Sequence, residues 1–256
     1  MMNLMDVTIL GFIEGFTEFL PVSSTGHMIL AAAALKLRNE EFLKTFEISI
    51  QLGAILAIVF LYARRLLGNM LLYKKLATAF VPTAILGFLA YKIIKTYLFN
   101  PIVVSMALIL GGLVLILVDK IIPKRAVNHA QVEDISYRSA FMIGLCQSIS
   151  MIPGVSRAAA TIIGGMCNGL DKKQAMEFSF LLAIPTMCAA TGYDLLKTST
   201  HWTGDQFMML TFGAVIAFLS AWAAVKFFLA YVEKNGFALF GYYRIVLGMV
   251  FLGFFL

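Results

Sequence analysis

Two glutamates in an apolar stretch near the start of the chain are the first candidates for chemistry. Glu14 and Glu18 lie four residues apart, so a helix would place both carboxylates on one face. Carboxylates in apolar surroundings are costly and are usually paired or functional. The pair could hold a divalent cation through its oxygens, or one carboxylate could act as a general base. The alternative is a structural pair that helix ends or Arg157 neutralise.

A run of hydroxyl side chains follows these glutamates, after a proline. Ser23, Ser24 and Thr25 stand before Gly26, and we expect them to form a turn beside a helix N-terminus. Hydroxyls and free backbone donors at such a place make a cradle for an anion. His27 closes the run, and its imidazole could move a proton near neutral pH or attack phosphorus itself. The sequence therefore predicts a phosphate site in this turn.

A second turn, Pro153–Arg157, interrupts another apolar stretch in the second half of the chain. A guanidinium matches phosphate oxygens in bidentate geometry, so Arg157 is a candidate for both phosphate binding and catalysis. The backbone of Gly154 and the hydroxyls of Ser156 and Thr161 could add donors. The other interpretation is that Arg157 merely neutralises the two buried glutamates.

Four further polar residues lie in apolar segments. Glu47 and Gln51 share one helix face by the same spacing argument and are predicted to support the site. Gln147 occupies the place in the second stretch that Glu14 has in the first, and it is a candidate for the same supporting role. Arg244 stands alone, and we expect it to be a structural or interfacial cation.

The composition sets where these residues must lie. The chain has 256 residues, 61% of them hydrophobic and 13% charged, with a mean hydropathy of +0.89. A soluble domain has about 25% charged residues. The chain is therefore expected to be an integral membrane protein, and its net charge of +6 is interpreted as basic loops facing anionic lipid and not as a nucleic-acid surface.

Six apolar segments are long enough to span a bilayer, and two more are broken in the middle. The spans are predicted near 46–62, 76–91, 101–118, 175–193, 207–229 and 238–256. Stretches near 5–35 and 137–169 are interrupted by their proline turns, which predicts two helical halves of roughly 12–15 residues, each too short to cross. The predicted fold is all-α, with about six spanning helices and two re-entrant hairpins inside the bundle.

The order of these elements predicts an inverted repeat within a single membrane domain covering 1–256. A hairpin returns to its starting side and three spans follow, so the second half (about 137–256) should be upside down relative to the first (about 1–118). Of the 20 Lys and Arg residues, twelve fall on one predicted face, six on the other, and two within apolar segments. The basic face is expected in the cytoplasm, with loops 63–75 and 119–136 on it and both termini outside.

The sequence resembles the undecaprenyl-diphosphate phosphatase family of the bacitracin-resistance type over essentially its whole length. The matching stretches are Glu14–His27 (EGFTEFLPVSSTGH), Pro153–Arg157 (PGVSR), Phe46–Ala54 (FEISIQLGA) and Phe178–Pro185 (FSFLLAIP). The family usually has a serine after the arginine of the second stretch, where this chain has Ala158. Either that serine is dispensable, or one phosphate contact is missing here.

The resemblance implies hydrolysis of undecaprenyl diphosphate to the monophosphate carrier of cell-wall assembly. It implies acid, base or metal roles for Glu14 and Glu18, phosphoryl-transfer roles for His27 and Arg157, and a divalent cation, Mg²⁺ or Ca²⁺. We expect a hydroxyl or water activated by His27 and Glu18 to attack, with Ser24, His27 and water all open as the nucleophile. A site opening to the outer side of the bacterial plasma membrane is expected, and the sequence allows a homodimer.

Two other functions fit the same pattern. Inverted repeats with broken helices are a transporter architecture, so a polyprenyl-phosphate transporter or flippase is the first alternative. A structural membrane subunit is the second, and it would leave the buried Glu, His and Arg side chains unexplained.

Overall fold

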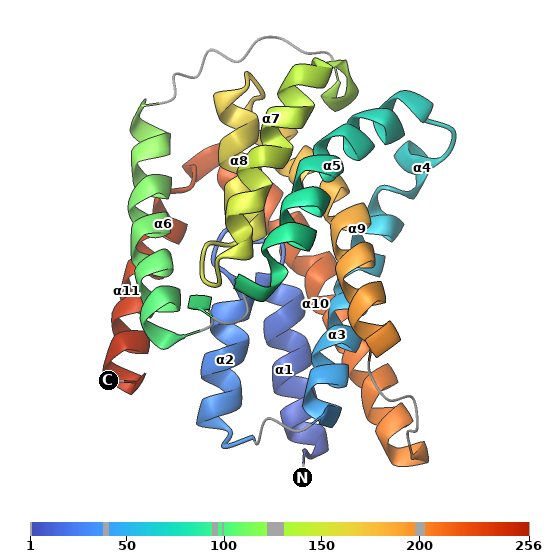
Figure 1. The fold of residues 1–256 in the computed structure, drawn as a ribbon, viewed down its shortest axis with the longest axis vertical. Helices are drawn as coiled ribbons and strands as arrows, with labels where there is room; N and C mark the ends of the chain where they lie inside the picture. The colour runs from blue at the N-terminus through green and yellow to red at the C-terminus, as the bar shows by residue number, and fades with distance from the viewer. Residues whose placement is uncertain are drawn as a thin grey trace.

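The computed structural model describes residues 2–37, 41–93, 97–98, 100–121, 131–197 and 203–255, and within these ranges the chain is helical and has no strand (Figure 1). Two short 3₁₀ segments, Val132–Asp134 and Ile149–Met151, flank the seventh helix. The α-helices are α1 (Leu4–Thr17), α2 (Ser24–Ala34), α3 (Glu41–Leu61), α4 (Ala63–Leu66), α5 (Met70–Ile93), α6 (Pro101–Ile121), α7 (Tyr137–Ser148), α8 (Arg157–Cys167), α9 (Lys172–Lys197), α10 (Gly204–Asn235) and α11 (Ala238–Phe255).

Two hairpins of short helices meet inside the bundle. In Figure 1 the α1–α2 hairpin rises from the end where both chain termini lie, and the α7–α8 hairpin descends from the opposite end. Their helices have 14, 11, 12 and 11 residues, which is too short to cross about 30 Å of hydrocarbon. The two helical hairpins predicted at 5–35 and 137–169 are present, and their re-entry into the bilayer stays a prediction.

Longer helices surround the hairpins. Five of them, α3, α5, α6, α9 and α10, are long and apolar enough to cross a membrane, and α11 has a shorter apolar stretch, Ala238–Phe254. These six helices overlap the six predicted spans. Most of them are longer than predicted, because they continue into polar residues that the apolar pattern did not include. Part of the predicted loop at 119–136 lies outside the described residues.

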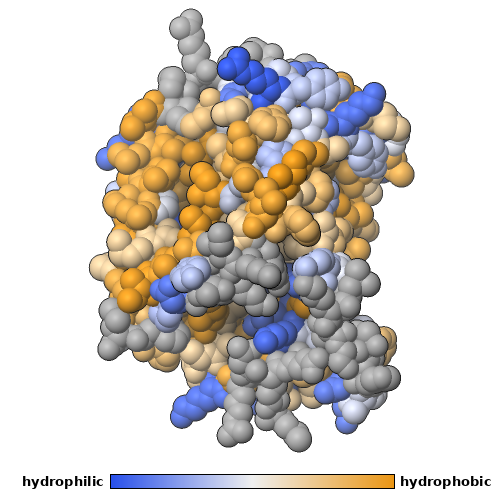
Figure 2. All heavy atoms as spheres, viewed as in Figure 1, coloured by the Kyte–Doolittle hydropathy of each residue, from blue (hydrophilic) through white to orange (hydrophobic). Residues whose placement is uncertain are grey.

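The outer surface is apolar, as a lipid-facing bundle requires. Phe60, Phe88 and Leu89 expose 66%, 82% and 70% of their surface. Figure 2 shows apolar residues over much of the viewed face, with hydrophilic residues at its upper end and others in its lower part. The chain is therefore a polytopic all-α membrane protein.

Each hairpin is fixed to a spanning helix by a close backbone contact at a glycine. A Cβ added to Gly15 of α1 would lie 2.3 Å from the carbonyl oxygen of Ala217 in α10, and one added to Gly144 of α7 would lie 2.0 Å from that of Ala79 in α5. Small residues at such places let helices approach closely in a membrane, where the hydrophobic effect does not drive association. Either glycine replaced by alanine would push a hairpin away from its support.

Hydroxyl groups reinforce the same two contacts. Ser220 of α10 donates to the Gly11 carbonyl at 3.5 Å, and Thr83 of α5 donates to the Gly144 carbonyl at 3.0 Å. The two hairpins thus rest on different helices through the same kind of contact.

Candidate active site

The two predicted glutamates lie at the C-terminal end of α1, Glu14 in its last turn and Glu18 as its C-cap. The amide of Glu18 donates to the Glu14 carbonyl at 2.9 Å, so the helical spacing persists through Glu18. Both side chains are buried, with 2% and 9% of their surface exposed. The expected juxtaposition of two carboxylates on one helix face is therefore present.

Each hairpin turn ends in a serine with a left-handed backbone. Ser23 has φ 69° and Ser156 has φ 73°, which are unusual for residues other than glycine and cost about 1–3 kcal/mol each. The Ser23 hydroxyl accepts from the Gly26 amide at 3.4 Å, and the Ser156 hydroxyl accepts from the Ala159 amide at 3.2 Å. Each serine caps the returning helix, and the capped N-termini of α2 and α8 are the two nearest sources of positive helix dipole.

The helices start earlier than the sequence analysis expected. The segment Ser24–His27 forms the first turn of α2 and not part of the loop, so the prediction of a turn through His27 is wrong in this respect. The physical reason is the capping serine, since a strong N-cap one residue earlier allows Ser24 to adopt helical geometry at once. Thr25 is exposed in this first turn, while Ser24 points to Glu18.

The carboxylate of Glu18 is held by both hairpins. Ser24 donates its hydroxyl to Glu18 Oε2 at 2.5 Å, and Arg157 donates from Nη2 to Glu18 Oε1 at 3.1 Å. Ser24 and Arg157 are the first residues of α2 and α8, so the two opposed helix starts meet at one carboxylate. The two turns therefore face each other, and Arg157 pairs with Glu18, one of the two glutamates that it was predicted to neutralise.

Arg157 is further held by α9. Its Nη1 donates to the Ser179 carbonyl at 2.9 Å, and Thr161 pairs its hydroxyl with the Ser179 hydroxyl at 2.6 Å. The ring of Phe19 lies 5.5 Å from the guanidinium carbon. Thr161 thus helps to hold Ser179, the residue whose carbonyl binds Arg157. A direct contact of Thr161 with phosphate stays a prediction. Ser179 lies within the matched Phe178–Pro185 stretch, but its role was not anticipated.

His27 turns away from the carboxylates. Its Nδ1 lies 2.8 Å from the Ser23 carbonyl and its Nε2 lies 2.6 Å from the hydroxyl of Tyr243 in α11. Within the described residues, the Ser24 hydroxyl is bonded to Glu18 and not to His27. Tyr243 was missed because nothing in its local sequence separates it from other aromatic residues at the lipid surface.

Arg244 joins the two turns through hydrogen bonds to a backbone carbonyl of each. It is fully buried, and its guanidinium donates to the carbonyls of Pro21 at 3.0 Å and Gly154 at 2.9 Å, and to two carbonyls of α6, those of Ala107 and Leu108. The prediction of a structural cation is confirmed. Its bridging of both turns was not predicted, because Arg244 lies far from either turn in the sequence.

The helix α6 leaves room for this guanidinium at Gly111. A Cβ added there would lie 2.1 Å from Nη2 of Arg244. Gly154 is constrained as well, since it has φ 96° and an added Cβ would lie 2.5 Å from the Val104 carbonyl oxygen.

The predicted supporting residues differ in how well they are bonded. Gln147 is fully buried, and its amide nitrogen donates to Thr83 at 2.9 Å and Thr186 at 3.1 Å. Glu47 and Gln51 are half-buried on α3, and no hydrogen bond in the described part of the chain joins them to the turns. Their supporting role stays a prediction.

Two buried side-chain atoms lack a hydrogen-bond partner among the described residues, and both belong to this site. They are Oε1 of Glu14, an acceptor, and Nε of Arg157, a donor. An unpaired buried polar atom costs about 1–3 kcal/mol, more when charged, so such atoms usually have a purpose. An open acceptor suits a bound cation, and an open donor suits a bound anion.

The carboxylate pair fits a metal ion that takes its remaining ligands from the substrate better than one that the protein alone coordinates. No group of three or more His, Cys, Asp or Glu residues is arranged for a metal in the described ranges. Mg²⁺ is commonly held by one or two carboxylates together with substrate phosphates. Glu14, with its open oxygen, and the neighbouring Glu18 therefore fit a divalent cation that also binds the substrate.

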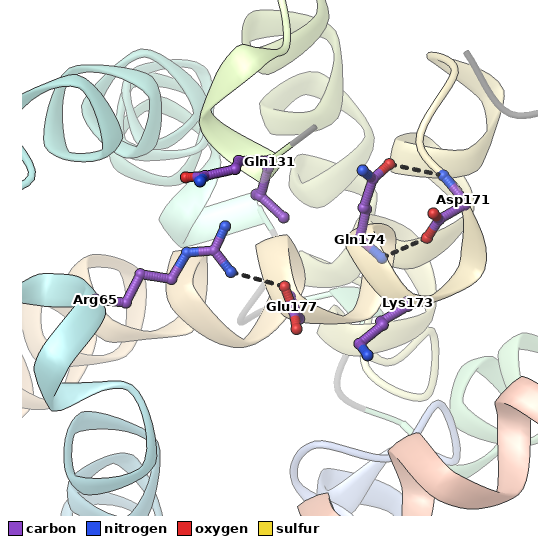
Figure 3. A pocket seen from close by; sticks show the side chains of 7 residues that line it. Arg65, Gln131, Asp171, Lys173, Gln174 and Glu177 are labelled. Atoms are coloured by element: carbon purple, nitrogen blue, oxygen red, sulfur yellow. Dashed lines mark hydrogen bonds and ion pairs between the residues drawn. The ribbon is translucent and has the colours of Figure 1, made fainter. Parts of the chain in front are cut away.

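A second polar cluster lies at the opposite end of the molecule from the termini and is separate from this site. Arg65 pairs with Glu133 and Glu177, each at 2.8 Å, beside a cavity of about 580 Å³ (Figure 3). Although burial raises the pKa of Glu133, hydrogen bonds from Arg65 and Asn69 outweigh it and leave that pKa below its ordinary value. No residue of either turn lines this cavity, so we assign it no part in the chemistry.

Comparisons with known proteins cover almost the whole chain. Residues 7–250 match the family described as bacitracin resistance protein BacA. Proteins named undecaprenyl-diphosphatase from Persephonella marina and Aquifex aeolicus are 52% and 49% identical, over 98% and 97% of each chain respectively. A third of that name, from Wolinella succinogenes, is 49% identical over 98% of each chain.

Proposed function

The chain belongs to the BacA bacitracin-resistance family, and from this we infer that it is an integral membrane phosphatase that hydrolyses undecaprenyl diphosphate to undecaprenyl phosphate and inorganic phosphate. The full-length relatives carry the name of that enzyme, and the flippase alternative has no support from them. A structural subunit is excluded for the same reason.

The observation that carries the site assignment is the pair of open, buried atoms on Glu14 and Arg157. The diphosphate of the substrate would bind beside Arg157, at the N-termini of α2 and α8. Phosphoryl transfer depends mainly on positioning and on neutralising charge at the phosphate oxygens. Arg157 supplies a fork for those oxygens, and Ser23, Thr25, Gly154, Ser156 and Thr161 remain the proposed neighbours of the phosphates.

The attacking oxygen is best assigned to Ser24. Its hydroxyl already donates to Glu18 at 2.5 Å, so Glu18 is placed to take the proton as the oxygen attacks the terminal phosphorus. The bond from that phosphorus to the bridging oxygen breaks, and undecaprenyl phosphate leaves. Water then hydrolyses the phosphoserine and releases inorganic phosphate. His27 is proposed to exchange a proton with the phosphate group from the other side of Ser24.

We propose that Glu14 and Glu18 hold a divalent cation, Mg²⁺ or Ca²⁺, together with the substrate. When bound, the cation would neutralise charge on the diphosphate oxygens. Glu18 would then serve both the cation and the Ser24 proton, while Arg157 moves from Glu18 towards the phosphates.

The site is proposed to open to the outer side of the bacterial plasma membrane. Both termini lie at the end from which the α1–α2 hairpin rises (Figure 1), and the twelve-to-six distribution of Lys and Arg supports an outer location for that end. A cysteine introduced at position 68 should react with an impermeant label only after the cells are opened. Labelling of residue 68 from outside intact cells would reverse this orientation.

The function is tested with the purified protein in detergent, undecaprenyl diphosphate and a phosphate-release measurement. We expect release with Mg²⁺ or Ca²⁺ and strong loss on adding a chelator, with recovery when the cation is restored. Ser24→Ala should lose turnover, and phosphate transferred from labelled substrate should be trapped on Ser24 of the wild-type protein. Substrate binding without any phosphate release would refute the phosphatase function. Full activity of Ser24→Ala would instead show that water, and not Ser24, is the nucleophile.

A further inference from the structure

Both ring nitrogens of His27 have partners, and the partners differ in kind. Nδ1 lies 2.8 Å from a backbone carbonyl, that of Ser23, and Nε2 lies 2.6 Å from the phenol oxygen of Tyr243. The imidazole and the phenol ring are nearly parallel, with an interplanar angle of 10°. His27 is on the first hairpin and Tyr243 is on the last helix, so the contact joins the two ends of the chain.

These partners determine where the proton of the neutral ring lies. A carbonyl oxygen can only accept a hydrogen bond, so Nδ1 must carry the proton that it donates to Ser23. Nε2 is then the unprotonated nitrogen, and it accepts the hydroxyl proton of Tyr243. Without the phenol, only the Ser23 carbonyl would constrain the ring.

We propose that Tyr243 is a positioning residue for His27: by donating to Nε2 it keeps the imidazole in the orientation in which Nδ1 donates to Ser23, and so keeps Nε2 as the nitrogen that exchanges a proton in the reaction. This inference rests on the role of His27 in the proposed function. A histidine whose other nitrogen is fixed by a hydrogen bond needs no tautomer change before it acts. The phenol hydroxyl donates to Nε2 until a phosphate oxygen of the substrate replaces it, so it keeps the ring oriented between turnovers.

Position matters here more than residue type, because the neighbouring residue is also a tyrosine. Tyr242 exposes 56% of its surface, and its hydroxyl makes no hydrogen bond within the described part of the chain. Tyr243 exposes 46% and bonds to His27. Tyr243→Phe and Tyr242→Phe therefore remove the same atom from the same helix, and only the first removal should affect His27.

The first measurement reads the tautomer directly. The full chain, labelled with ¹⁵N-histidine in detergent, contains three histidines, and the His27 signals are those missing from His27→Gln. In the wild-type protein Nε2 should give the signal of a hydrogen-bonded, unprotonated nitrogen. In Tyr243→Phe that signal should move downfield or split between tautomers, while Tyr242→Phe should match the wild type.

The second measurement separates positioning from stability. We expect kcat of Tyr243→Phe to fall about 10-fold with KM changed less than about twofold, because only part of a general acid–base contribution of 10²–10⁴ is lost. In the His27→Gln background the same change should have no further effect, since the phenol acts only through the imidazole.

An unchanged Nε2 signal in Tyr243→Phe overturns the proposal, and so does a loss of activity that is undiminished in the His27→Gln background. Wild-type turnover of His27→Gln would instead overturn the role of His27 in the proposed function. The nitrogen signal would then still decide by itself whether Tyr243 holds the ring through Nε2, so the two failures are distinguishable.

Discussion

The two helical hairpins share a backbone design and differ in their chemistry. In both, a short helix enters, a left-handed serine caps the returning helix, and the returning helix directs its N-terminus at the other hairpin. The first hairpin carries two glutamates, a reactive hydroxyl and a histidine. The second contributes one charged side chain to the site, Arg157, together with hydroxyl and amide side chains.

The sharpest contrast is between Glu14 and Gln147, which occupy matching positions relative to the capping serines. The amide of Gln147 is bonded to two threonines, whereas Glu14 leaves one buried oxygen without a partner in the described residues. One position is satisfied by the protein, and the other is open to a ligand. The two halves therefore share a backbone geometry, but at this matched position only the first leaves a buried polar atom without a hydrogen-bond partner among the described residues.

The strongest test of this contrast is Glu18→Gln. The amide keeps the size of the side chain but cannot take the Ser24 proton and binds Arg157 more weakly. We expect phosphate release to fall about 10³-fold or more, since removal of one preorganised electrostatic group costs that much in other enzymes. The measurement is kcat/KM on protein of normal yield. Retention of more than about a tenth of the wild-type rate would remove Glu18 from the mechanism.

A reciprocal exchange between the hairpins comes next. Glu14→Gln makes the first hairpin like the second and should lower phosphate release about 10²-fold, because a ligand of the cation is lost. It should not lower the thermal midpoint, since it removes a buried carboxylate with an open oxygen. The apparent affinity for Mg²⁺ should fall in the same variant.

Gln147→Glu is the matched change in the second hairpin. It buries a carboxylate beside Thr83 and Thr186 with no described cation bonded to it, so the expected result is a loss of several degrees in thermal midpoint. If Glu14→Gln destabilised the protein and Gln147→Glu did not, the assignment of open and satisfied positions would be reversed.

Gly111→Ala tests whether the turns depend on the guanidinium that joins them. The added methyl group would meet Arg244 at its Nη2 and shift the contacts to Pro21 and Gly154. A turnover loss of about 10-fold is expected, because small misplacements of catalytic groups are expensive. Gly192→Ala is the control, since an added Cβ there meets nothing within 4 Å. Equal activity of the two variants would show that the turns hold their places without Arg244.

The smallest effect is expected for Ala158→Ser, which restores the serine usual in the family. Ala158 is fully buried in the apolar core, so the structure favours the interpretation that this serine is dispensable. Phosphate release should stay within about twofold of wild type, the range of a change that makes no transition-state contact. A gain of tenfold or more would mean that a phosphate contact is missing in this chain.

Much of the fold could be predicted because its signals are local. Proline, glycine and serine interrupt both apolar stretches, and the cost of isolated charges in lipid predicted the meeting of Arg157 and Glu18. Arg244, Tyr243 and Ser179 could not be placed, because their partners lie on other helices and depend on how the bundle packs. The bounds of the two repeats and the roles of Glu47 and Gln51 stay predictions.

The contact of Gly15 with Ala217 has a consequence for how the protein is made. The surface that receives α1 is on α10, and the Arg244 contact to Pro21 comes later still. At about 5–20 residues per second, the ribosome needs roughly 10–40 s to synthesise the residues between them. During that interval the first hairpin, with both carboxylates, has no finished place in the bilayer. The first hairpin can therefore reach its final place in the bilayer only after the last helices have been inserted. A nascent chain stalled before α10 should expose Glu14 and Glu18 to water-soluble reagents.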